Sequence, residues 1–126
     1  MRILLDTHVF LWAVASDRRL GASAREKIAQ ADAVFVSAAS LWEIAIKSRL
    51  GKIDGDLGEL LAAVGASGFQ ELPVRGSHAA VVATLPMIHG DPFDRLLVAQ
   101  AMTEPLRLLT ADVLLTGYTD LVMLVT

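Results

Sequence analysis

Short apolar runs with β-forming character alternate along the chain with longer segments of helical period. Four of the apolar runs predict strands, which cover residues 2–6, 33–37, 106–110 and 121–125. A weaker fifth strand is predicted at 69–74, where Pro73 would confine it to a sheet edge or end it. The helical segments cover residues 7–15, 22–31, 38–50, 56–66, 77–85 and 92–104. This alternation predicts an α/β domain with a central, mainly parallel sheet sandwiched by helices.

The composition is that of one domain with a well-filled core. The chain has 126 residues, 54% hydrophobic and 20% charged, so we expect a single domain over residues 1–126. It has no cysteine, which excludes disulfides and thiolate metal sites and leads us to expect a reducing, cytoplasmic setting. The longest stretch without Asp, Glu, Lys or Arg, residues 76–90, is shorter than the roughly 18 apolar residues of a spanning helix. We therefore expect no membrane partner.

The net charge limits how this protein could bind nucleic acid. The formal charge is -3 and the sequence pI is about 5.5, so the molecule is not a basic domain and any RNA contact must be local. The best basic candidates are Lys47, Arg49 and Lys52 in the segment IAIKSRLGKI. The alternative is that they are solvated cations, which are favoured near the carboxyl end of any helix.

Several acidic residues stand where a strand gives way to a helix. Asp6 closes the first predicted strand, and Asp112 follows the strand at 106–110. In the stretch HGDPFDRLLVAQA, Asp91 and Asp94 flank the start of a helix whose first position is Pro92. Each acid could simply cap exposed N–H groups at a helix start. Capping accounts well for Asp91 and equally well for Asp6 and Asp112.

Two acids are less easily explained as surface residues. Asp94 shares its side of the helix with apolar positions that should face inward, and an inward carboxylate needs a partner. Glu43 interrupts the apolar run 41–46, and Ala39, Ile46 and Leu50 lie around the same side of its helix. Its ordinary partner would be Lys47, one turn on. We interpret Trp42, on the apolar side of this helix, and Trp12 as core residues, although both could serve interfaces.

Taken together, the acids suggest a metal site. Asp6 and Asp112 end strands and Asp94 begins a helix, at the level where open α/β sheets place their sites. Carboxylates about 5 Å apart would repel by roughly 3 kcal/mol per pair at an effective dielectric near 20, and a divalent cation would relieve that repulsion. Oxygen ligands favour Mg²⁺ or Mn²⁺ over zinc, and such a centre assists phosphodiester hydrolysis. Spacing alone does not show that the acids meet, because strand order is not visible in one sequence.

Four blocks of the sequence resemble those of the PIN-domain ribonucleases, and more narrowly of the VapC toxins of toxin-antitoxin modules. The blocks are LLDTHVFLW, SAASLWEIAIKSRLGKI, LPMIHGDPFDRLLVAQA and LLTADVLLTGY. The resemblance implies an α/β/α sandwich that binds Mg²⁺ or Mn²⁺ through clustered acids and cleaves RNA endonucleolytically. Matched residue by residue, those acids are Asp6, Glu43, Asp94 and Asp112, whereas Asp91 becomes a secondary contributor or a cap.

The resemblance also bears on neighbouring residues and on partners. Thr7 and Thr110 stand beside acids and could hold them by hydrogen bonds, or could serve ordinary turns. Arg95 could contact an RNA phosphate, but we favour an ion pair with Asp91. Membership would imply inhibition by a cognate antitoxin and a homodimer.

Two rival functions remain open at this stage. One is an aspartyl-phosphate phosphatase, which is disfavoured because His8 stands where that chemistry usually has a second acid. The other is a catalytically idle domain that binds RNA or an antitoxin, in which the acids receive basic side chains.

Overall fold

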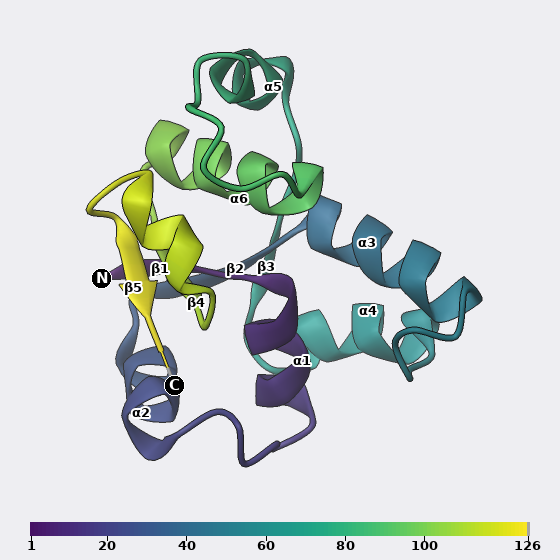
Figure 1. Ribbon diagram of the computed structural model, residues 1–126. Helices are drawn as coiled ribbons and strands as arrows, with labels where there is room; N and C mark the ends of the chain where they lie inside the picture. Colours follow the sequence, from purple (N-terminus) through teal and green to yellow (C-terminus); the bar gives the residue numbers. More distant parts are fainter. Residues whose placement is uncertain (126) are drawn as a thin grey trace.

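A computed structural model describes residues 1–125 and contains one five-stranded sheet whose strands are all parallel. The strand order is β3-β2-β1-β4-β5, so the first strand lies at the centre (Figure 1). The strands are β1 (Arg2–Leu5), β2 (Ala33–Ser37), β3 (Gln70–Leu72), β4 (Arg107–Thr110) and β5 (Val122–Leu124). All five predicted strands are present, and β3 lies at the sheet edge and ends just before Pro73, as the missing N–H of proline requires.

The six predicted helices are also present. They are α1 (Thr7–Val14), α2 (Ala22–Gln30), α3 (Ala38–Arg49), α4 (Leu57–Ala66), α5 (Gly76–Val82) and α6 (Pro92–Thr103). A short 3₁₀ helix, η1 (Val113–Gly117), follows β4. The helix predicted at 77–85 starts one residue earlier and ends at Val82, because Thr84 and Leu85 turn back in 3₁₀ fashion to the carbonyls of Val81 and Val82.

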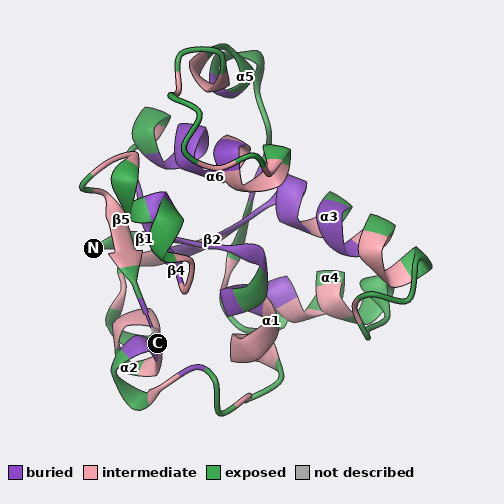
Figure 2. Cartoon of the chain, viewed as in Figure 1, coloured by how far each residue is buried: buried purple, intermediate pink, exposed green. Residues whose placement is uncertain are grey.

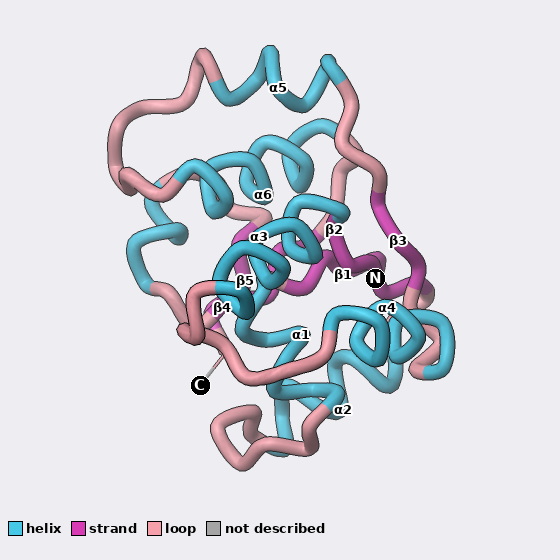
Figure 3. The backbone as a smooth tube through the Cα atoms, turned by 90° about the vertical axis from the view of Figure 1, so that its right-hand side faces the viewer, coloured by secondary structure: helices cyan, strands magenta, loops and turns pink. Residues whose placement is uncertain are grey.

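Apolar side chains cover both faces of the sheet, as expected for parallel strands. On one face Ile3 and Leu5 pack with residues of α1, α2, α3 and α4, among them Phe10 and Ile44. On the other face Leu4 and Leu108 pack against α6 and η1. The side view in Figure 3 shows these layers, with α5 stacked on α6 away from the sheet. The central strands β1 and β4 are among the most buried segments, whereas the edge strand β5 is coloured mostly as intermediate in Figure 2. The α/β fold with helices on both faces is therefore confirmed.

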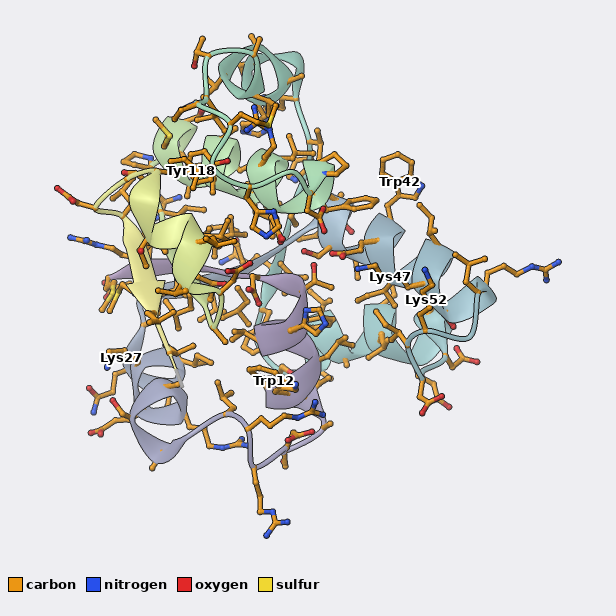
Figure 4. The ribbon with its side chains drawn as sticks, viewed as in Figure 1. Trp12, Lys27, Trp42, Lys47, Lys52 and Tyr118 are labelled. Atoms are coloured by element: carbon orange, nitrogen blue, oxygen red, sulfur yellow. The ribbon has the colours of Figure 1, made fainter. Side chains whose placement is uncertain are left out.

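One face of α3 differs from the prediction. The face that carries Trp42, Ile46 and Leu50 is exposed, with Trp42 and Leu50 each 62% accessible. Figure 4 shows Trp42 pointing away from the body of the molecule, so its interpretation as a core residue was wrong. The buried stripe lies further round the helix and includes Glu43 and Ile44, because α3 packs between the sheet, α1 and α6. Trp12, in contrast, packs against the core in part.

Within residues 1–125 there is no helix that is both long enough and apolar enough to span a membrane.

Candidate metal centre

Sheet order places the candidate site at the carboxyl ends of β1 and β4. β1 pairs with β2 on one side and with β4 on the other. The chain builds the sheet outward from β1 to β3 in one direction and then from β4 to β5 in the other, so the strand order switches between β1 and β4. Open α/β sheets characteristically bind ligands at such a switch point. Asp6 immediately follows β1 and Asp112 follows β4 by two residues. The two acids from opposite ends of the sequence are therefore neighbours in space.

Asp6 is buried and is held from two sides. Its Oδ1 accepts the backbone N–H of Val9 at 2.8 Å, so it does cap α1. Its other oxygen, Oδ2, accepts the hydroxyl of Thr110 at the end of β4. Burial raises the pKa of Asp6, and these two hydrogen bonds oppose that rise only in part. Asp6 can therefore cap α1 with one oxygen and still belong to the candidate site.

Glu43 projects from the buried side of α3 and is only 2% exposed. Its Oε1 accepts the hydroxyl of Thr7 at 2.6 Å, and that hydroxyl lies 2.9 Å from the Oγ of Ser40. Its Oε2 pairs with the ammonium of Lys47 at 2.6 Å, which is the i,i+4 pair considered from the sequence. The contact with Glu43 raises the pKa of Lys47, and Asp91 and Asp94 add to the rise. Lys47 therefore lies within the field of the acidic cluster.

Asp91 and Asp94 have different environments at the start of α6. Asp91 is the N-cap, and its Oδ1 accepts the N–H of Phe93 at 2.8 Å and, more weakly, that of Asp94 at 3.4 Å. Burial raises the pKa of Asp94 to about 7, and Asp91, Asp6 and Glu43 contribute through charge repulsion. Asp94 therefore lies where the negative field of the other acids is concentrated.

His89 is the residue of this cluster that the sequence argument missed. Its Nε2 lies 2.8 Å from Oδ2 of Asp112 and 3.5 Å from Oδ2 of Asp94. Donor atoms of these three residues lie within 4.8 Å of one another, and theirs is the one such group of three or more possible ligands among residues 1–125. The signal in the sequence was a histidine two residues before the N-cap Asp91. A histidine at that position does not indicate a site by itself, because its contact with Asp112 forms only when the loop is folded.

Asp6 and Glu43 lie outside that tight group. Each is within electrostatic reach of Asp94, but their oxygens are engaged by Thr110 and by Thr7 and Lys47. The predicted four-acid set is thus divided into an outer pair, Asp94 and Asp112, and an inner pair that is hydrogen-bonded. The hydrogen bonds considered for Thr7 and Thr110 are both present.

Arg95 does not form the ion pair with Asp91 that we favoured. Its guanidinium is 8% exposed and donates to the carbonyls of Val82, Leu85 and Pro86 and to the hydroxyl of Tyr118. These bonds fix the connection between α5 and α6, because the guanidinium supplies several donors in one plane. Tyr118 lies beside α6 in Figure 4. So buried a cation is poorly placed to meet an RNA phosphate.

The other two basic candidates lie away from this cluster. Arg49 is the last residue of α3 and Lys52 follows that helix, and both side chains are exposed, whereas Lys47 contacts Glu43 directly.

The donor set fits Mg²⁺ or Mn²⁺. It is made mainly of carboxylate oxygens, which hard divalent cations prefer, and it contains no thiolate. Burial raises the pKa of Asp94, and repulsion from Asp91, Asp6 and Glu43 adds to the rise, so the charged carboxylate is disfavoured when nothing neutralises it. Asp94 and Asp112 would hold such a cation, whose positive charge would stabilise their ionised carboxylates.

Comparison with known proteins agrees with this geometry. The model of the PIN domain family matches residues 3–116, which is most of the chain. The chain belongs to the PIN-domain family. It is also 35% identical over 118 residues to Ribonuclease VapC22 of Mycobacterium tuberculosis, covering 87% of this chain and 86% of that protein. The resemblance inferred from the four sequence blocks is therefore confirmed.

Solved structures share the PIN-domain fold over nearly the whole chain. The VapBC2 complex of Rickettsia felis, bound to a promoter DNA fragment, contains a chain that matches with a TM-score of 0.70 and 14% identity, covering 98% of this chain and 97% of that one. A toxin-antitoxin complex from Klebsiella pneumoniae matches with a TM-score of 0.67 and 15% identity, covering 96% and 95%. At such identities the likeness concerns the fold alone.

Proposed function

We propose that this PIN-domain protein is a Mg²⁺- or Mn²⁺-dependent endoribonuclease that acts as the toxin of a VapBC-type toxin-antitoxin module. The observation that carries the proposal is the convergence of Asp94 and Asp112 on one site beside Asp6 and Glu43, at the carboxyl ends of β1 and β4. The 35% identity to Ribonuclease VapC22 supports RNA as the substrate.

In this proposal the four acids, Asp6, Glu43, Asp94 and Asp112, hold the metal and its surroundings. Bound Mg²⁺ or Mn²⁺ would supply Lewis-acid polarisation of the scissile phosphate and stabilise the developing negative charge. Asp94 and Asp112 present the outer carboxylates, whereas Asp6 and Glu43 orient water and are themselves oriented by Thr110 and Thr7. Lys47, which pairs with Glu43 and is partly exposed, would contact an RNA phosphate. Asp91 serves mainly as the helix cap.

Substitution of single acids tests the proposal. Asp6→Asn and Asp94→Asn should each abolish Mn²⁺-dependent cleavage of a labelled RNA and growth arrest on expression, while the circular dichroism spectrum stays that of the wild type. The matched control is Asp56→Asn, because Asp56 caps α4 at an exposed position and asparagine caps equally well. Cleavage by Asp6→Asn at the wild-type rate with added Mg²⁺ would exclude this mechanism.

A metal titration separates the nuclease from a catalytically idle binding module. Mn²⁺ should raise the unfolding temperature of the wild type, and the Asp94→Asn variant should lose that increase. A wild-type protein that is indifferent to Mn²⁺ would favour the idle module that binds RNA or an antitoxin.

We propose two protein partners, a cognate antitoxin and a second copy of the chain. The neighbouring helices α3 and α4 carry the exposed apolar side chains Trp42, Ile46, Leu57 and Leu61, and Leu50 is exposed just after α3. These side chains support a protein interface, because large exposed apolar patches mark such surfaces. The fold neighbours from Rickettsia felis and Klebsiella pneumoniae are a VapBC complex and a toxin-antitoxin complex, which supports the antitoxin. Light scattering of the wild type and of Trp42→Ser tests the homodimer. Co-purification with the product of an adjacent small gene tests the antitoxin.

A further inference from the structure

The hydrogen bonds of His89 show which nitrogen of its imidazole is the acceptor. Its Nδ1 lies 3.0 Å from the backbone N–H of Asp91, which can only donate, so Nδ1 must be the accepting nitrogen. In a neutral imidazole the proton then sits on Nε2. Nε2–H is directed at Oδ2 of Asp112, 2.8 Å away. A nitrogen that carries a proton offers no lone pair to a metal ion.

The loop that carries His89 is fixed by hydrogen bonds to Tyr118 and Arg95. The backbone N–H of His89 donates to the Tyr118 hydroxyl at 2.8 Å. Arg95 donates to the same hydroxyl at 3.1 Å and to the carbonyl of Pro86 at 2.9 Å. The imidazole is therefore aimed before any ligand arrives, which is what a supporting group requires.

We infer that His89 is a positioning residue of the proposed metal centre, which fixes the carboxylate of Asp112 through Nε2–H and does not itself bind the metal. This inference rests on the proposed metal-dependent function. Oδ1 of Asp112 accepts the N–H of Leu114 at 3.0 Å, so both carboxylate oxygens are anchored. Each oxygen keeps a further lone pair for a cation.

The position of His89 also explains how Asp112 and Asp94 lie so close together. Its Nε2 is 3.5 Å from Oδ2 of Asp94, so one N–H dipole lies between two carboxylates that would otherwise repel. Partners of this kind around a metal site typically change metal affinity by about 10- to 100-fold when they are removed.

Two substitutions separate the roles of the two imidazole nitrogens. In His89→Asn, the short amide oxygen can still accept the N–H of Asp91 in an Asx-turn, but its amide nitrogen does not reach Asp112. In His89→Gln, the longer side chain carries an amide N–H to the place of Nε2. We expect His89→Asn to weaken Mn²⁺ binding by about 10- to 100-fold and His89→Gln by no more than about 3-fold.

Mn²⁺ affinity is measured by isothermal titration calorimetry without RNA, after circular dichroism and urea unfolding in EDTA have verified the fold. If His89 only shapes the loop, His89→Asn will bind Mn²⁺ like the wild type, and the inference is overturned. Equal losses in both variants overturn it as well. Pulsed electron paramagnetic resonance adds a direct readout, because a nitrogen coupling typical of a coordinated imidazole in the Mn²⁺-loaded wild type would identify His89 as a ligand.

The same titrations distinguish this inference from the function on which it rests. Wild-type protein that binds Mn²⁺ and loses it in Asp94→Asn, together with an unaffected His89→Asn, would overturn only the role of His89. Wild-type protein that binds no Mn²⁺ would overturn both.

Discussion

Two histidine-carboxylate pairs with nearly the same geometry lie at opposite ends of α6. At the carboxyl end, Nδ1 of His78 accepts the N–H of Arg75 at 2.9 Å and Nε2 lies 2.7 Å from Oε2 of Glu104. At the amino end, Nδ1 of His89 accepts the N–H of Asp91 at 3.0 Å and Nε2 lies 2.8 Å from Oδ2 of Asp112. Ten residues of helix separate Asp94 from Glu104, about 15 Å. The local hydrogen bonding alone does not tell the two pairs apart.

The surroundings of the two pairs differ. His78 is fully buried between α5 and α6, where Gln100 also packs against it. His89 is partly exposed and faces a second carboxylate, that of Asp94, and the field of the inner acids. The first pair therefore joins two helices, whereas the second belongs to a cluster of like charges, in which we propose the metal site. The comparison teaches that the neighbours of a histidine-carboxylate pair decide its role.

The largest expected difference between the pairs concerns catalysis. Asp112→Asn should reduce Mn²⁺-dependent RNA cleavage by at least about 100-fold, because it removes a charged group that we assign to the metal centre. The equivalent change Glu104→Gln, at the other end of the helix, should leave the rate within about twofold. Initial rates on one labelled RNA measure both. Equal losses would mean that the two pairs do not differ in function.

The next effect, on stability, should run the other way. His78→Asn should lower the free energy of unfolding by about 2–4 kcal/mol, because it leaves a cavity in a fully buried position and removes the partner of Glu104. His89→Asn should cost less than about 1 kcal/mol in metal-free buffer, since its site is partly solvated. Urea unfolding in EDTA gives both values. If His89→Asn lost more unfolding free energy than His78→Asn, the pair at the amino end of α6 would be the structural one, contrary to our assignment.

A smaller effect should appear in the pH dependence of the metal-free protein. The pKa of Asp94 is raised to about 7 by burial and by Asp91, from an ordinary 3.8. Between about pH 4 and pH 7 the unfolded chain therefore loses this proton before the folded chain does, and stability falls as pH rises. We expect the fall to be on the order of 1–3 kcal/mol and to be absent in Asp94→Asn. Thermal unfolding of the wild type and of Asp94→Asn in EDTA from pH 4.5 to 8 measures this fall. The same pH dependence of stability in both proteins would contradict the prediction.

The smallest effect is expected at Asp91, whose backbone supports His89 and whose side chain caps α6. Asp91→Asn keeps both the N–H and a capping oxygen, so cleavage should stay within about 3-fold of the wild type. Loss of its charge should lower the pKa of Asp94, and the stability decline should then be completed at a lower pH. A loss of activity as large as that of Asp112→Asn would make Asp91 part of the centre.

Local patterns were sufficient for much of this site. Asp91 and Pro92 predicted the start of α6, and the inward side of that helix predicted that Asp94 would need a partner. Glu43 was expected to face protein, and it does. The misplaced residues were Trp42 and Arg95, because both lie where local pattern is ambiguous. The sequence of an apolar helix face does not show whether that face packs inside the domain or is exposed. The position of an arginine in the first turn of a helix does not show which backbone carbonyls will accept its hydrogen bonds.

The sequence by itself determined the elements, their caps and the acids at their ends, because these depend on residues a few positions apart. Only the tertiary structure decided which ends meet. The parallel pairing of β1 with β4 brings Thr110 to Asp6 across 104 positions of sequence. The folded loop before α6 sets the nitrogen of His89 that faces Asp112. Contacts between distant segments depend on strand order and on loops that are held by buried groups such as Arg95. Neither strand order nor loop conformation produces a periodic pattern in the sequence.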